Sequence, residues 1–160
     1  MLLWLAAVAF SAPPAWRDAP GDVIAEVVTR RPASELYLKL TDLRSLAAVY
    51  PADCAISWVH GGASTGPEAR ARVTYRMAGW RRRLTARFAT LEENRVVQLD
   101  HEGNKGFVTQ WAFDEVDGST RVTMGSYVAA PPWPFKRYYV FQVQPAWVDC
   151  QKRTLEALIR

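Results

Sequence analysis

Two residues near the middle of the chain, Cys54 and His60, are of the types that form a thiol nucleophile and its general base. They are six residues apart in a segment, Cys54–His60, that the sequence predicts to be a strand. At about 3.3 Å per residue their side chains would lie about 20 Å apart, far beyond hydrogen-bond reach. The spacing argues against nucleophilic catalysis, and the sequence assigns no catalytic residue.

His101 is the better candidate for acid–base chemistry, because Asp100 and Glu102 flank it and carboxylates can hold an imidazolium near neutral pH. It stands at the end of a predicted strand beside Gly103–Asn104, so we expect it at the surface. A metal site would have to combine both cysteines and both histidines of the chain, which show none of the usual short ligand spacings. Neither a metal nor a cofactor is predicted.

Seven arginines and no acidic residue occupy positions 70–87, a local charge of +7. Alternation places most of them on the outer face of a sheet and at a hairpin tip. There Arg81, Arg82 and Arg83 could bind an anionic membrane surface or an acidic partner. The alternative is a solvated face whose arginines pair with acids on neighbouring strands, such as Asp100.

The whole chain has 160 residues, 49% hydrophobic and 22% charged, which is typical of one folded domain. Disorder, collagen and a disulfide-stapled miniprotein are excluded. The net charge of +4 is too mild to indicate nucleic acid, and no nucleic-acid partner is predicted. Cys54 and Cys150 are expected to be two buried thiols, because free cysteine behaves as a small hydrophobe; the alternative is one disulfide.

Residues 1–20 read as a leader that precedes a single domain at 21–160. Leu2–Phe10 is uncharged and apolar, too short to span a bilayer but the length of a secretory hydrophobic region. Small residues at Ala9 and Ser11 offer a cleavage site, although a basic segment is missing. We expect export, or a periplasmic location; the alternative is a cytoplasmic protein whose leader is a short anchor or a misassigned start.

The elements that position these residues begin with a β-branched run, Val23–Thr29, that predicts a strand. Pro32–Glu35 has the chemistry of a helix start, and Asp42 can cap a second short helix that Pro51 ends. From Arg70 onwards apolar and polar residues alternate, so the hydrophobic pattern repeats every two residues, which is the period of a strand. Further strands are expected, in an antiparallel sheet of about seven strands that has one face exposed to solvent. Turns are expected at Gly79 and Asp117–Gly118, among others. These runs are Cys54–His60, Arg70–Met77, Leu84–Phe88, Arg95–His101, Gly106–Phe113 and Thr120–Val128.

The C-terminal stretch from Pro134 has an apolar helical face and no glycine, and a helix of that length would be about 40 Å long. Pro145 lies inside it, so we expect a kink or two helical pieces.

This order of elements resembles the helix-grip fold of the START/Bet v 1-like (SRPBCC) superfamily of polyketide cyclases and lipid-transport proteins. The likeness covers about residues 22–160. It is carried by Pro32–Asp42, by the aromatic–proline pair Tyr50–Pro51, by the glycines Gly61–Gly62 and Gly66, and by the hairpin Trp111–Val122. Asp42–Pro51 and the same hairpin are also similar to coenzyme-Q-binding and aromatase-type members.

The resemblance implies an α+β fold in which a curved antiparallel sheet surrounds a long C-terminal helix, with two short helices after the first strand. It also implies an apolar cavity for a lipid, isoprenoid or polyketide-like molecule. Six rings fall on faces predicted to point inward and are the candidate ligand-binding residues, with a plain aromatic core as the alternative. They are Trp58, Tyr75, Phe88, Trp111, Phe113 and Trp147.

The first functional hypothesis is therefore a non-catalytic binder or carrier of a hydrophobic small molecule. The alternatives are a cyclase- or dehydratase-like enzyme that uses the same cavity, and a scaffold that binds membrane or protein through its basic sheet face. An enzyme needs a buried polar constellation. The sequence offers only isolated candidates for one, namely Tyr75, Gln98, Asp100 and Ser126.

Overall fold

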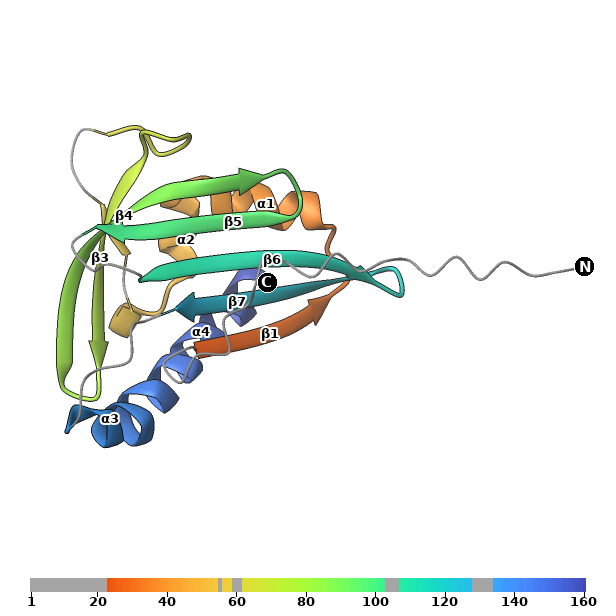
Figure 1. Ribbon diagram of the computed structural model, residues 1–160. Coiled ribbons are helices and arrows are strands. Elements are labelled where there is room, and N and C mark those ends of the chain that lie inside the picture. The colour runs from red at the N-terminus through yellow and green to blue at the C-terminus, as the bar shows by residue number, and fades with distance from the viewer. Residues whose placement is uncertain (1–22, 55, 59–61, 103–106, 128–133) are drawn as a thin grey trace, which may run out of the picture.

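The computed structural model describes residues 23–54, 56–58, 62–102, 107–127 and 134–160 (Figure 1). The expected leader and His60 lie outside the described residues. In chain order the elements are β1 (Val23–Thr29), α1 (Ala33–Thr41), α2 (Leu43–Val49), a 3-10 turn (Ala52–Cys54), β2 (Ile56–Trp58), β3 (Arg70–Met77), β4 (Trp80–Glu92), β5 (Val96–Glu102), β6 (Val108–Val116), β7 (Ser119–Tyr127), α3 (Phe135–Tyr138), a π-helical segment (Tyr139–Val143) and α4 (Gln144–Leu158).

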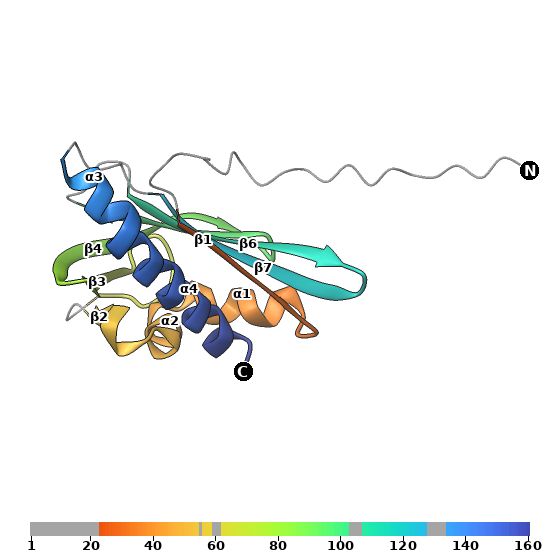
Figure 2. The same ribbon diagram turned by 90° about the horizontal axis from the view of Figure 1, so that it is seen from below.

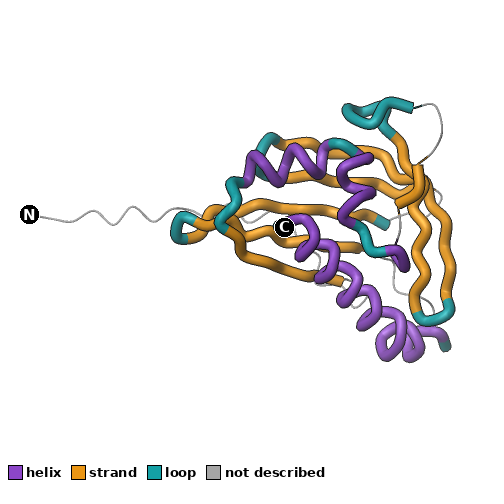
Figure 3. Tube along the Cα trace, turned by 180° about the vertical axis from the view of Figure 1, so that it is seen from behind, coloured by secondary structure: helices purple, strands orange, loops and turns teal. Residues whose placement is uncertain are grey.

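Within the described residues, seven strands form one antiparallel sheet in the order β1-β7-β6-β5-β4-β3-β2. Helices α1, α2 and α4 lie on one face of this sheet, and α4 crosses that face diagonally (Figures 2 and 3). This α+β, helix-grip arrangement, with two short helices after the first strand, confirms the fold that the sequence predicts.

Local chemistry explains where the elements begin and turn. The Asp42 carboxylate accepts a hydrogen bond from the backbone N–H of Arg44 at 3.0 Å, so it caps α2 as expected. The β6–β7 hairpin turns through Asp117 and Gly118, with φ of 50° and 72°. Two successive positive φ angles are typical of the two-residue turns that match the twist of paired strands, and Asp-Gly favours them.

We call the sheet surface beneath α4 the inner face. Alternate residues of each strand point to it, because side chains alternate across a strand. Its buried members on β3 to β7 are Ala71, Val73, Tyr75, Ala86, Phe88, Val97, Leu99, His101, Thr109, Trp111, Phe113, Val122, Met124 and Ser126. Four leucines of α1 and α2 complete the core, Leu36, Leu40, Leu43 and Leu46, each with no exposed surface.

The C-terminal helix runs from Phe135 to Leu158 and widens into π-helical turns at Tyr139–Val143. Pro145 follows after one further residue, Gln144. Its nitrogen carries no hydrogen to donate to the preceding turn, which accounts for the interruption expected there. Across the described ranges, none of the helices combines the length and the apolar character needed to cross a bilayer.

Candidate functional site

The structure buries five of the six candidate rings on the inner face or on α4. Tyr75, Phe88, Trp111, Phe113 and Trp147 each expose at most 8% of their surface. The sixth, Trp58, belongs to β2, and its side chain is outside what the structure describes. The inward orientation read from the sequence is therefore confirmed for these five rings.

Two of the predicted rings meet in a cluster at one end of the inner face. Tyr75 of β3 lies 5.4 Å from Trp147 of α4, centroid to centroid. Phe107, just before β6, lies 5.5 Å from Tyr75 and 5.2 Å from Trp147. We call these three rings and the His101 imidazole the ring cluster. Phe113 lies apart from it, edge-on to Tyr37 of α1 at 6.4 Å.

His101 is buried, with 4% of its surface exposed, so the expectation of a surface histidine is wrong. It pairs with Ala86 across β4 and β5, which places it on the inner face. Its ring stacks on Phe107 at 4.1 Å with an interplanar angle of 18°. Asp100 and Glu102 point to the other face by alternation, and Glu102 pairs instead with Arg70 at 3.1 Å.

The burial of His101 decides its charge. Removal from water disfavours the imidazolium, and it lowers the pKa of His101 from 6.5 to about 3. Burial also raises the pKa of the Tyr75 phenol, an effect that a hydrogen bond with Thr109 partly offsets. Both rings are therefore neutral at pH 7.

A chain of hydrogen bonds links the ring cluster to α4. The Nε2 atom of His101 lies 3.0 Å from Thr109 Oγ1, and Thr109 Oγ1 lies 3.3 Å from Ser126 Oγ. The Gln151 side-chain amide donates to Ser126 Oγ at 2.7 Å. Histidine, threonine, serine and glutamine come from β5, β6, β7 and α4 in that order, and all four are buried. We call them the polar chain.

The polar chain is the buried constellation that the sequence did not reveal. Of the four polar candidates read from the sequence, only Ser126 and Tyr75 lie in it or beside it; Gln98 instead donates a hydrogen bond to Asp100 at 3.1 Å, part-buried. Two atoms of the polar chain, His101 Nδ1 and Gln151 Oε1, are buried without a hydrogen-bond partner among the described residues.

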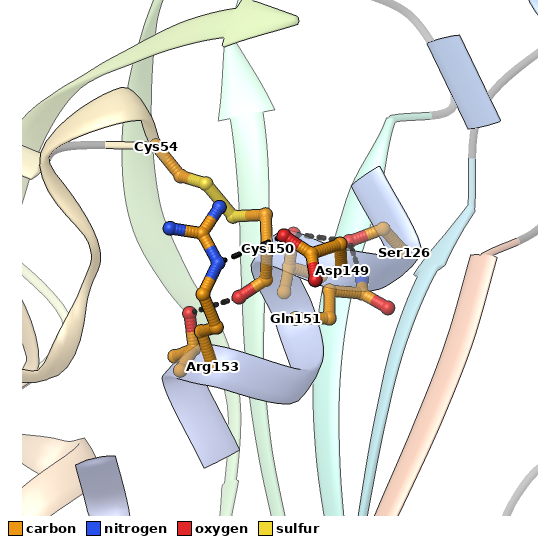
Figure 4. Close-up of a disulfide and its surroundings, with 8 residues drawn as sticks. Cys54, Ser126, Asp149, Cys150, Gln151 and Arg153 are labelled. Carbon is orange, nitrogen blue, oxygen red and sulfur yellow. Dashed lines mark hydrogen bonds and ion pairs between the residues drawn. A yellow bond between two sulfur atoms is a disulfide. The ribbon is translucent and has the colours of Figure 1, made fainter. Parts of the chain in front are cut away.

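Cys54 and Cys150 form a disulfide, which corrects the expectation of two free thiols (Figure 4). Cys54 lies in the 3-10 turn after α2 instead of on a strand, and Cys150 precedes Gln151 on α4. Their Cα atoms are 6.6 Å apart and both residues are buried. The bond ties α4 to the turn after α2 beside the polar chain, and it removes Cys54 from consideration as a nucleophile. Within the described ranges no group of three or more His, Cys, Asp or Glu side chains is placed to hold a metal ion.

The outer side of the β3–β4 hairpin carries six exposed arginines, which we call the arginine face: Arg70, Arg72, Arg76, Arg81, Arg83 and Arg87. Arg70 lies directly opposite Arg87, and Arg76 directly opposite Arg81. The charges of Arg83 and Arg76, together with some desolvation, lower the pKa of Arg81. Arg82 pairs with Tyr75 and so belongs to the other side of the hairpin.

The start of the C-terminal helix lies against the tip of this hairpin. The Tyr138 hydroxyl donates a hydrogen bond to the carbonyl of Ala78 in the turn. Phe135 and Phe141 expose 54% and 67% of their surface close by in the sequence, and Lys136 and Arg137 are exposed between them. Basic and aromatic side chains therefore meet at one end of the molecule.

No protein-family model matches the chain. No curated protein matches it either. Solved structures do. The KanY protein in its NMR solution structure is 13% identical over 86% of this chain and 93% of that chain, with a TM-score of 0.70. A protein from Thermus thermophilus is 18% identical over 86% and 94%, with a TM-score of 0.67. Major latex-like protein 151 from Panax ginseng is 13% identical over 87% and 95%, with a TM-score of 0.61.

At these identities the likeness shows the fold, which is START/Bet v 1-like, as the sequence resemblance predicts.

Proposed function

We propose that the protein binds a hydrophobic small molecule, of lipid, isoprenoid or polyketide-like character, between the inner face and α4. The observation that carries the proposal is the ring cluster: aromatic side chains from β3, α4 and the start of β6 gather there next to a buried, uncharged polar chain. Ligand pockets typically combine apolar and aromatic walls with a few convergent polar groups.

Trp111→Ala tests this proposal, because Trp111 is fully buried at the centre of the inner face. We expect the variant to bind a fluorescent fatty acid or isoprenoid about tenfold more weakly than wild type, equivalent to about 1.4 kcal/mol. It also removes a large core side chain, which costs about 3–5 kcal/mol of unfolding free energy. Leu36→Ala, at an equally buried site on α1, is the control: it should lower stability by about 2–5 kcal/mol and leave affinity nearly unchanged. If wild type binds no member of a broad lipid panel, the proposal fails.

A second candidate is a cyclase- or dehydratase-like enzyme acting in the same place. The polar chain favours it, because linked hydroxyl and imidazole groups can pass a proton toward or away from a bound molecule. Mass spectrometry of the ligand recovered from the binding experiment separates the two candidates. A carrier returns the ligand unchanged. A dehydratase returns a product lighter by one water, and a cyclase returns an isomer that chromatography ahead of the mass spectrometer separates from the ligand.

We further propose that the arginine face and the exposed aromatic residues of the helix start attach the protein to an anionic membrane surface. Like charges directly opposite on paired strands repel, so the pair Arg76–Arg81 favours a negative partner. Arg70, opposite Arg87, already has one in Glu102. Phe135 and Phe141 supply apolar side chains of the kind that insert at the headgroup level.

Reversal of three charges of the arginine face near the tip, Arg76→Glu, Arg81→Glu and Arg83→Glu, should strongly weaken attachment to vesicles that contain acidic lipids. At about 1 kcal/mol per arginine near the surface, the loss is about 100-fold. The control variant, with Arg44, Arg95 and Arg153 changed to glutamate, alters the net charge equally at exposed positions elsewhere. Co-sedimentation should weaken as salt is raised from 0.1 to 1 M, where the Debye length falls to about 3 Å. Equal, salt-insensitive sedimentation of all three proteins would remove the membrane role.

We also propose that the protein is exported, with a periplasmic or extracellular location. The Cys54–Cys150 bond supports this, because structural disulfides persist mainly in oxidising compartments. Alkylation of protein isolated from its native host under denaturing conditions should find both sulfurs blocked; two reactive thiols would favour the cytoplasmic alternative.

A further inference from the structure

Arg82 is a charged residue that lies beside the ring cluster. It is directly opposite Tyr75 in the register of β3 and β4. Side chains opposite each other on antiparallel strands point to the same face, with their Cβ atoms about 4.5–5.5 Å apart. Because Tyr75 contacts Trp147 of α4, the stem of the Arg82 side chain begins next to the aromatic wall of the proposed binding site.

The direction of Arg82 separates it from the arginine face. Its neighbours Arg81 and Arg83 point to the outer side of the hairpin, because side chains alternate along a strand. Among the described residues that β3 and β4 direct inward, Arg82 alone carries a formal charge. Its side chain is exposed, whereas that of Tyr75 is buried. The Arg82 guanidinium therefore lies where the ring cluster meets solvent.

This end of the inner face is close to the tip of the hairpin. Tyr75 is three residues before Ala78 in the turn, which is about 10 Å along a strand. The start of the C-terminal helix meets the tip there, where the Tyr138 hydroxyl donates to the Ala78 carbonyl (Figure 1). Positions 69–91 and 118–148, which supply most of the hairpin and the start of this helix, contain no aspartate or glutamate. The charged residues of both segments are therefore basic, which favours the approach of an anion.

Along the polar chain and the ring cluster, in contrast, no group carries a formal charge at pH 7. His101 is neutral, and the other members of the polar chain carry hydroxyl or amide groups, which do not ionise. An acid group placed among the rings would lose its hydration without gaining an opposite charge, which is unfavourable. Beside Arg82 it gains a cation and keeps part of its water. The arrangement fits a molecule whose apolar part lies against the rings and whose acid group stays at the solvent boundary.

We propose that Arg82 selects amphipathic anions, in which one carboxylate or phosphate group is joined to an apolar chain or ring. The acid group binds the guanidinium, whose planar fork matches the oxygens of both groups, and the apolar part lies against the ring cluster. This inference rests on the proposed ligand-binding function and narrows it from hydrophobic molecules in general. Because exposed ion pairs contribute little, the effect of the charge should be about fivefold in affinity.

Four probes with the same linear alkyl chain test the inference: decanoic acid, decyl phosphate, decanol and decylamine. Isothermal titration calorimetry at pH 7 measures their affinities. Arg82→Gln should weaken the binding of decanoic acid or decyl phosphate about fivefold and leave decanol nearly unchanged. A response confined to one of the two acids identifies carboxylate or phosphate as the group that Arg82 recognises.

Arg83→Gln is the matched control, because it removes the same charge one residue away on the outer side of β4. It should leave all four affinities nearly unchanged. Arg82→Glu gives the sharper result, since it should weaken the acids and strengthen decylamine. A gain for one probe and a loss for another cannot come from partial unfolding of the variant. Arg83→Glu should produce no such reversal.

The outcomes separate this inference from the function on which it rests. If Arg82→Gln changes the acids and decanol equally, the inference is overturned and hydrophobic binding stands. If Arg83→Gln has the same effect as Arg82→Gln, the net charge of the hairpin acts in place of a specific side chain, and the inference is again overturned. Failure of wild type to bind any of the four probes also overturns it, and the broad lipid panel then decides separately on the proposed function.

Discussion

Replacement of both Cys54 and Cys150 with alanine is expected to lower the free energy of unfolding by about 4 kcal/mol. The disulfide joins residues 96 positions apart and so restricts much of the unfolded chain. In the chain-entropy description a closed loop of about 100 residues is worth about 4.7 kcal/mol, and measured values cluster at about 2–4 kcal/mol. In urea, where small proteins lose about 2 kcal/mol per molar denaturant, the midpoint should fall by about 2 M.

Reduced wild-type protein is the control for this prediction, because it keeps both sulfur atoms in place and lacks only the bond. Its unfolding midpoint should match that of the double-alanine variant measured without reductant. A large gap between the two would assign the loss to packing around the buried sulfurs. A double variant as stable as the oxidised wild type would contradict the prediction.

Local signals in the sequence were sufficient to predict most of the fold. Val23–Thr29 and Arg70–Met77 are strands with the expected bounds. Asp42 caps the second helix, and Asp117–Gly118 turns a hairpin. Each of these features depends on residues that are close together in the chain, such as a cap and the N–H two residues later, so the sequence displays them directly.

His101 shows where a local signal was available but a competing one was preferred. Alternation from Val97 through Leu99 places position 101 on the same buried face, and the structure confirms that register. The adjacent turn residues and flanking carboxylates indicated an exposed strand end instead. Gln151, for which the sequence analysis makes no prediction, falls four residues after Trp147 and four before Leu155, on the apolar side of its helix.

The disulfide and the polar chain could not be predicted in the same way, because their members meet only after the sheet has formed and α4 has packed on it. Ser126 and Gln151 are 25 residues apart, and Cys54 and Cys150 are 96 apart. No spacing rule connects such positions in an antiparallel fold. The buried polar atoms that the chain leaves open are likewise a property of the packed arrangement alone.

The second large effect is a loss of stability in acid that depends on His101. Its pKa is about 3 in the folded protein and about 6.5 when the chain is unfolded, so between these values the unfolded chain binds one more proton. The unfolding free energy therefore rises with pH across this window, and the contribution is complete only above about pH 6.5. As the pH falls it is lost at up to about 1.4 kcal/mol per unit, or about 3 kcal/mol between pH 7 and pH 4.5.

Urea unfolding of wild type and His101→Phe at pH 7, 6, 5 and 4.5 measures this loss. Because carboxylates titrate in both proteins, the informative quantity is the difference in unfolding free energy between them. The variant loses the hydrogen bond to Thr109 and should be less stable at pH 7, but the difference should shift in its favour by about 3 kcal/mol by pH 4.5.

Tyr75→Phe is the matched control for this titration. It also removes a hydrogen-bond partner of Thr109 and lies within the ring cluster, but the Tyr75 phenol does not ionise in this range because burial raises its pKa. Its difference from wild type should therefore be the same at every pH. Parallel curves for wild type and His101→Phe would show that His101 takes up its proton in the folded protein, and that the imidazole is not held neutral by burial on the inner face.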